Sequence, residues 1–80
     1  MTLAELNIHQ WGVVKEVKGS GALRQRLLDM GITPHTKIML KRIAPFGDPI
    51  TIVLRGYELT IRRADGKNIV IEPLGEGGRP

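Results

Sequence analysis

Apolar and polar residues alternate along most of this chain, which is the period-two pattern typical of β-strands with one buried face. The alternating segments are short, rich in Val, Ile and Leu, and separated by clusters of glycine, proline, aspartate and asparagine. A brief apolar lead-in of Leu3, Leu6 and Ile8 precedes them. We therefore predict five strands, over residues 12–17, 37–44, 50–54, 57–63 and 68–72.

The connections between the later strands carry clear turn signals. Arg55-Gly56 predicts a tight hairpin turn, because glycine accepts the positive φ that such turns demand. Residues 45–49 hold two prolines and a glycine, which predicts a loop. Ala64-Asp-Gly66 predicts a turn before the last strand.

One segment, residues 22–30, has the longer period of a helix. Leu23, Leu27 and Met30 fall on one helical face. Ser20 stands at the N-cap position, and Gly31 stands where a left-handed glycine ends many helices. We predict a helix of two to three turns between the first and second strands.

Together these elements predict a mainly β fold, a small barrel of about five strands with one short α-helix. Five short strands are too few for an immunoglobulin-size sandwich, whereas a curved barrel removes most sheet edges and needs only a modest core. In the second strand, alternation places Ile38, Leu40 and Arg42 on one face. We expect one domain over residues 1–74 and a flexible tail over 75–80.

Composition limits where and how such a domain can act. There is no cysteine, so no disulfide or thiolate site supports the core, and this agrees with a cytoplasmic location. No apolar run reaches the roughly 18–20 residues that cross a bilayer, so we expect no direct membrane insertion. The formal charge of +4 favours acidic partners, although it also serves solubility.

Candidate catalytic residues are scarce. Ser20 is the one serine, and a nucleophile would need a base and an orienting group beside it. Its position before the helix is explained by N-capping. Gly19-Ser-Gly21 precedes Arg24 and Arg26, but the spacing of a phosphate-binding loop is missing. We expect no enzymatic activity.

Metal binding is only weakly indicated by the sequence. Imidazoles bind transition metals, but a lasting site needs three or four convergent ligands. Only His9 and His35 are available, and they are far apart in sequence. We expect no required cofactor and, at most, weak or adventitious transition-metal binding at these two candidates.

Single-stranded nucleic acid is an alternative partner, because small barrels bind bases on exposed aromatics within a basic groove. That interpretation needs an aromatic such as Trp11 surrounded by basic residues such as Arg55 or Arg62. Since the sequence shows no clear aromatic–basic cluster, we rank it second.

Three segments, taken in order, resemble the FeoA family of ferrous-iron transport proteins. They are Leu3-x-x-Leu6 with residues 12–17, the segment 23–34 containing Arg26-Leu-Leu-Asp-Met-Gly31, and the segment 44–63 beginning Ala44-Pro-Phe-Gly-Asp-Pro. The resemblance implies an SH3-like barrel, similar to the C-terminal domains of iron- and manganese-dependent repressors. A detached domain of that regulatory type is a third interpretation, disfavoured because no DNA-binding helix pair is present.

What the resemblance implies is a cytoplasmic accessory protein, monomeric or weakly dimeric, that binds the permease FeoB, whose amino-terminal region is a GTPase. Binding residues concentrate in exposed loops and element ends. We therefore predict a partner-binding face at the helix end and at the 44–49 loop, made by Arg24, Arg26, Met30, Pro45, Phe46 and Asp48. The alternative, equally weighted, is that Phe46 packs into the core.

The chain departs from the family pattern at His9 and His35, which stand where glycine is usual, and at Gly66, where alanine is usual. Glycine at such turns supplies positive φ, which histidine adopts only at some cost. We also consider that the two substitutions bring two imidazoles to one surface.

Overall fold

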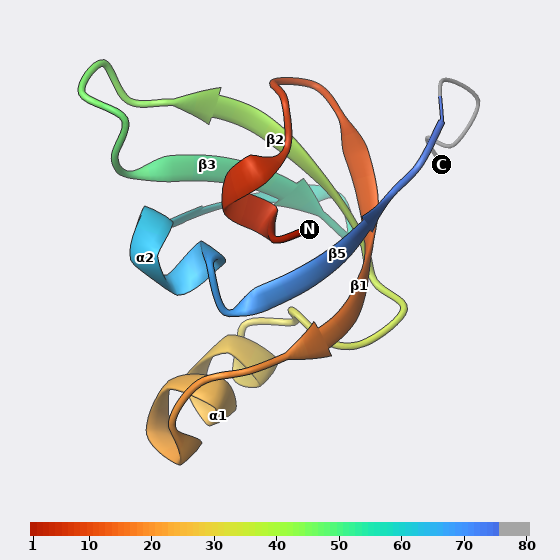
Figure 1. Ribbon diagram of the computed structural model, residues 1–80, viewed down its shortest axis with the longest axis vertical. Helices are drawn as coiled ribbons and strands as arrows, with labels where there is room; N and C mark the ends of the chain where they lie inside the picture. The colour runs from red at the N-terminus through yellow and green to blue at the C-terminus, as the bar shows by residue number, and fades with distance from the viewer. Residues whose placement is uncertain (76–80) are drawn as a thin grey trace.

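The computed structural model describes residues 1–75, whose strands form one strongly curved antiparallel sheet in the order β4-β3-β2-β1-β5 (Figure 1). The strands are β1 (Trp11–Val17), β2 (Lys37–Ile43), β3 (Ile50–Leu54), β4 (Tyr57–Ile61) and β5 (Ile69–Pro73). A 3₁₀ turn, η1 (Leu3–Glu5), precedes them, and the helices are α1 (Gly21–Asp29) and α2 (Arg63–Gly66). The mainly β fold with a short helix between its first two strands is confirmed.

The predicted fourth strand was too long at its end. It stops at Ile61, and the carbonyl of Arg62 accepts hydrogen bonds from the N–H groups of Asp65 (3.0 Å) and Gly66 (3.2 Å). The predicted turn is therefore a single helical turn, α2, which is too short to show a period in the sequence. Neither α1 nor α2, the two α-helices among residues 1–75, has the length and apolarity needed to cross a membrane.

The sheet curves like the predicted barrel, but its strands do not close it, so two sheet edges remain. In the strand order, β4 and β5 are the two edges. The chain's own start covers part of the β5 edge: Thr2 forms a bridge with Val70, and the N–H of Ile71 donates to the carbonyl of Met1 at 2.8 Å. Five strands thus build most of a barrel, and the N-terminal segment shields one of its edges.

A β-bulge in β2 reverses the predicted facing of one residue. Ile38 and Leu40 point into the core, as alternation predicts. The pairing with β3 then shifts between Leu40 and Arg42, and an extra residue in a strand changes the face on which later side chains lie. Arg42 is consequently exposed and donates to the carboxylate of Glu58 at 3.1 Å.

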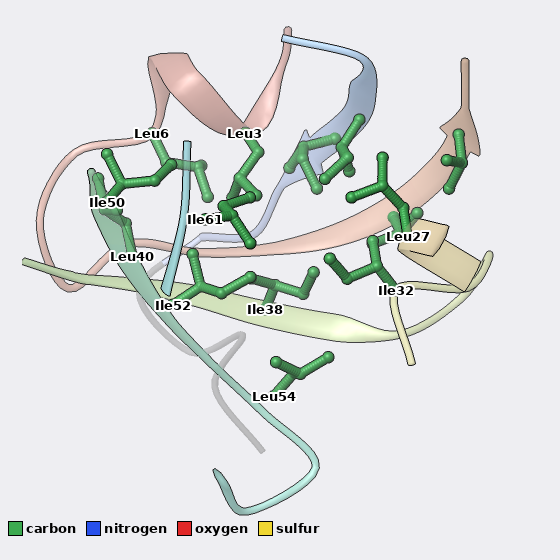
Figure 2. Packing of buried hydrophobic residues seen from close by; sticks show 14 residues of the cluster. Leu3, Leu6, Leu27, Ile32, Ile38, Leu40, Ile50, Ile52, Leu54 and Ile61 are labelled. Atoms are coloured by element: carbon green, nitrogen blue, oxygen red, sulfur yellow. The ribbon is translucent and has the colours of Figure 1, made fainter. Parts of the chain in front are cut away.

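The core lies inside the curve of the sheet, with apolar side chains arriving from every element except α2 (Figure 2). Helix α1 contributes the fully buried Leu27, and η1 contributes Leu3. The buried cluster comprises Leu3, Leu6, Val14, Val17, Leu27, Ile32, Ile38, Leu40, Ile50, Ile52, Leu54, Ile61, Ile69 and Ile71. Ile8, from the predicted apolar lead-in, is instead half exposed.

The predicted turn and cap residues act as expected. The Ser20 hydroxyl accepts a hydrogen bond from the N–H of Leu23 at 3.4 Å and so caps α1. Gly31 follows the helix with a φ of 95°. Arg55 (φ 49°) and Gly56 (φ 83°) both adopt positive φ, as a two-residue hairpin turn with the right-handed twist of its strands requires.

Candidate partner-binding face

The loop between β2 and β3, residues 44–49, is braced by its own backbone. The N–H of Ala44 donates to the carbonyl of Pro49 at 3.0 Å, and the N–H of Gly47 donates to the carbonyl of Ala44 at 2.8 Å. Gly47 has a φ of 91°, which few other residues adopt without strain. The carboxylate of Asp48 accepts a hydrogen bond from the backbone N–H of Arg63 at 2.9 Å. The loop is thereby tied to the start of α2.

Phe46 stands at the tip of this braced loop with its side chain entirely in solvent, at 101% relative exposure. The alternative in which Phe46 packs into the core is therefore wrong. Pro45 beside it is also exposed. Because nothing in the protein's own fold covers this ring, its whole apolar surface is available to be buried against a partner.

The predicted residues of α1 differ in how free they are. Nε of Arg24 donates to the carbonyl of Val17 at 3.0 Å, so this side chain ties the helix to β1. Arg26, on the exposed side, pairs with Asp65 of α2 at 3.2 Å. Met30 packs against the core, and its carbonyl accepts a hydrogen bond from the hydroxyl of Tyr57. Of the three, Arg26 is the residue most able to contact a partner.

Helix α2 joins the two predicted groups into one surface. On one side the backbone N–H of Arg63 donates a hydrogen bond to Asp48 of the loop. On the other side the carboxylate of Asp65 forms an ion pair with Arg26 of α1. Figure 1 shows the green loop, α2 and α1 following one another down the left side of the molecule. We call this surface the loop–helix face. Between α1 and β4 it is hollowed by about 370 Å³, lined by Arg26, Met30, Thr60, Ile61, Arg62 and Asp65.

Positive charge prevails on the loop–helix face. Arg26, Arg62 and Arg63 are exposed there, against the carboxylates of Asp48 and Asp65. Both carboxylates are engaged, one by a backbone N–H and the other by Arg26. The face therefore favours a partner that presents acidic groups, because complementary charge speeds association and selects among partners.

The two candidate metal ligands are not brought together. The backbone N–H of His9 bonds to Leu40 at one end of the β1·β2 ladder, and that of His35 bonds to Val14 at the other. His9 and Val14, the residue that His35 contacts, are five positions apart, which is roughly 16 Å of extended chain at 3.3 Å per residue. One ion bonded to both imidazoles at about 2 Å cannot span that distance. Within residues 1–75 no group of three or more His, Cys, Asp or Glu side chains could hold a metal ion.

Both histidines do adopt the backbone conformation expected where glycine is usual. The φ of His9 is 69° and that of His35 is 74°. These values lie in the left-handed region, which costs a residue with a side chain roughly 1–2 kcal/mol. The turns keep the geometry that glycine would give, and the two imidazoles are displayed in solvent.

A surface that the sequence analysis missed lies on the outer side of the sheet. An open hollow of about 440 Å³ is lined by Trp11, Pro34, His35, Thr36, Lys37, Val53, Arg55 and Gly56. Trp11 precedes a buried glycine and is only half buried, so alternation predicts that it faces outward. Its neighbours come from β2 and the segment that precedes it, from β3 and from the hairpin, and their proximity depends on strand order.

The three aromatics do not form one platform for nucleotide bases. Trp11 lies on the outer face of β1, Phe46 at the tip of the loop after β2, and Tyr57 is tied by its hydroxyl to Met30. Single-strand binding stacks successive bases on neighbouring aromatics, which this spacing does not favour.

Comparison with known proteins gives a consistent result. The family model described as the FeoA domain matches residues 1–73. Among curated relatives, the Fe(2+) transport protein A/Fe(2+) transporter FeoB fusion protein of Porphyromonas gingivalis is 33% identical over 72 residues. That match covers 90% of this chain but 8% of the fusion protein, so the chain spans a small part of this relative's length.

Solved structures agree with the sequence match. The NMR structure of a FeoA-like protein from Clostridium acetobutylicum has 35% identity and a TM-score of 0.88, covering 100% of this chain and 93% of that one. The zinc-complexed FeoA of Stenotrophomonas maltophilia, described as a prokaryotic SH3 domain protein, has 25% identity and a TM-score of 0.78. It covers 90% of this chain and 89% of that one, and the expected SH3-like fold is confirmed.

Proposed function

The chain belongs to the FeoA family, which is involved in ferrous-iron transport, and we propose that it acts by binding the cytoplasmic part of a FeoB-type iron permease. In this role it is a non-enzymatic accessory module that works in the cytoplasm. It recognises the permease, while Fe²⁺ is the cargo of the permease itself. The proposal requires no cofactor.

The fusion of the two proteins in Porphyromonas gingivalis supports the choice of partner. In that relative, a segment 33% identical to this chain shares one polypeptide with the FeoB transporter. Linking two modules raises the effective concentration of one for the other into the millimolar range. A lasting fusion is expected where the two parts act together, so a separate chain of the same family has reason to bind the same transporter.

The single observation that carries the binding mode is the full exposure of Phe46 on the braced 44–49 loop. Complete burial of a phenylalanine side chain contributes about 1.5–3 kcal/mol. The loop is already fixed by its backbone hydrogen bonds and by the Asp48–Arg63 contact, so little conformational entropy is lost on binding. Arg26, Arg62 and Arg63 add exposed positive charge elsewhere on the loop–helix face.

A direct binding assay tests the proposal. The purified chain is titrated against the isolated cytoplasmic GTPase region of a FeoB-type permease, and Kd is measured by calorimetry. We expect Phe46→Ser to raise Kd by about 30-fold, because loss of a central aromatic costs about 2 kcal/mol. Ile8→Ser is the matched control, since Ile8 is another exposed large apolar residue, outside the loop–helix face.

The outcomes separate cleanly. Equal weakening by Phe46→Ser and Ile8→Ser would show that general hydrophobicity, rather than the loop–helix face, drives binding. Absence of any saturable complex with the GTPase region would reject the proposed partner. Catalytic turnover by the chain alone would reject the non-enzymatic role.

A further inference from the structure

The outer face of the sheet carries an apolar row that crosses three strands. Trp11 of β1 stands opposite Met39 of β2, and Met39 stands opposite Val53 of β3. Their neighbours along each strand, such as Gly12, Ile38 and Leu54, are buried in the core, so the three side chains of the row must point to the other side. All three are only half buried. This row contributes nothing to the core.

The hollow of about 440 Å³ lies along this row, on the side nearest the hairpin, and most of its lining surface is apolar. Trp11 and Val53 line it, and Pro34 adds a further apolar wall. A volume of this size accommodates one or two large side chains of a ligand. We call this hollow the Trp11 groove.

The rim of the Trp11 groove is basic. His35, Lys37 and Arg55 all line it, and none of its lining residues is acidic. Arg55 is held by neutral groups, because its Nη2 donates to the hydroxyls of Thr33 and Thr36 at 3.0 Å each. Neither Lys37 nor Arg55 forms an ion pair with a carboxylate in the part of the chain that the structure covers, residues 1–75.

The carboxylates that border this face already have cationic partners. Glu58 of β4 stands opposite Val53 of β3, and its carboxylate accepts hydrogen bonds from both Lys41 and Arg42. Glu72 stands opposite Val13 on β5 and pairs with Lys15 at 3.1 Å. Glu58 and Glu72 therefore do not neutralise the positive charge of Lys37 and Arg55 at the groove. An anionic ligand would supply the opposite charge.

We propose that the Trp11 groove is a docking site for an acidic peptide segment that bears a bulky aliphatic side chain. The aliphatic side chain enters between Trp11 and Val53, and flanking carboxylates lie against Lys37 and Arg55. The partner is a protein, since the apolar row accepts aliphatic groups and offers one aromatic ring where a nucleic acid would need several. This site is separate from the loop–helix face and does not depend on the proposed permease contact.

Trp11 is the single tryptophan of the chain, so its fluorescence reports on this groove directly. The intact chain is titrated with a short blocked peptide in which glutamates flank two leucines. Two further peptides replace either the glutamates with glutamines or the leucines with glycines, and a deoxythymidine oligonucleotide completes the set. We expect a saturable change in Trp11 emission with the acidic, leucine-containing peptide, and affinity at least fivefold weaker for each altered peptide.

Charge reversal locates the contact. Lys37→Glu should weaken binding of the acidic peptide by about fivefold to tenfold, since it replaces one attraction with a repulsion. Lys18→Glu, at the end of β1, changes the net charge equally and lies outside the groove, so it should have little effect. Circular dichroism of both variants checks that they fold.

Three results would overturn the proposal: equal binding of the glutamine peptide, equal weakening by the two charge reversals, or tighter binding of the oligonucleotide than of the acidic peptide. The last would identify the groove as a nucleic-acid site. Because no permease is present in this experiment, its result is independent of the test in which Phe46 is replaced.

Discussion

Among the glycines of residues 1–75 that do not have positive φ, Gly12 should be the one whose replacement with alanine damages the fold most. A Cβ added at Gly12 would lie 2.2 Å from Cγ2 of Ile71 and 3.3 Å from the carbonyl oxygen of Glu72. Carbon atoms in contact are normally about 3.5–4.0 Å apart. Ile71 is buried and belongs to β5, the strand beside β1, so the added methyl group must push these two strands apart or force Ile71 out of its rotamer.

The size of the effect follows from two opposing contributions. Overpacking a core costs about 1–3 kcal/mol. The change from glycine to alanine restores about 0.4–1 kcal/mol by restricting the unfolded chain. We therefore expect Gly12→Ala to lower the free energy of unfolding by about 1–2 kcal/mol, or the Tm by roughly 5–15 °C in a domain of this size.

Gly66→Ala is the matched control. Its φ is not positive, and an added Cβ would meet Cδ1 of Ile50 at 3.4 Å and the backbone nitrogen of Ala4 at 3.6 Å, which are ordinary contacts. We expect this variant to be neutral or more stable by up to about 1 kcal/mol. Urea unfolding followed by circular dichroism measures both variants.

A second-site change tests the named clash. Ile71→Leu moves the branch of the side chain from Cβ to Cγ, away from the position of the added methyl group. Gly12→Ala should therefore cost less in the Ile71→Leu background than in the native chain, a coupling of about 1 kcal/mol. Equal costs in the two backgrounds, or equal stabilities of Gly12→Ala and Gly66→Ala, would refute the steric account.

Two further predictions concern the turns and the surface charges. His9→Gly and His35→Gly should each be more stable by up to about 1 kcal/mol than the alanine variant at the same site, because glycine adopts the positive φ of 69° and 74° without strain. A higher free energy of unfolding in urea for the alanine variants than for the glycine variants would contradict this. The hydrogen bond from Lys41, with further help from Arg42, holds the pKa of Glu58 below its ordinary value of 4.5. Because this pKa is lowered in the folded state, the stabilisation is present above about pH 4.5 and is lost as pH falls through the folded pKa. Glu58→Gln should therefore show a flatter fall in Tm between neutral pH and pH 3, and an unchanged slope would contradict the pairing.

The strands and turns were predictable because their signals are local. The hairpin around Arg55-Gly56 and the capping of α1 by Ser20 depend on residues a few positions apart. The end of β4 and the bulge in β2 were not predictable in this way. A one-turn helix has no measurable period, and a single inserted residue such as the one before Arg42 reverses facing without changing the local pattern.

The candidate faces depended on information that the sequence holds only in part. The prolines and glycine of residues 45–49 predict a loop, but the direction of Phe46 depends on the Asp48–Arg63 contact, which joins residues 15 positions apart. The grouping of Arg26 with Asp65 spans 39 positions. Trp11 and Val53 become neighbours of one groove because Met39 of β2 lies between them in the sheet, and that strand order is a property of the whole fold.

The residues available for recognition are those that the core does not use. Alternation commits one face of each strand to burial, and Ile38, Ile52 and Leu54 are fully enclosed. An apolar residue on the opposite face, such as Met39, gains little from the fold and is retained at a cost in solubility. A phenylalanine held out on a braced loop has the same cost. We therefore predict that substitutions at Met39 and Phe46 impair contacts with other proteins and leave the stability of the fold nearly unchanged.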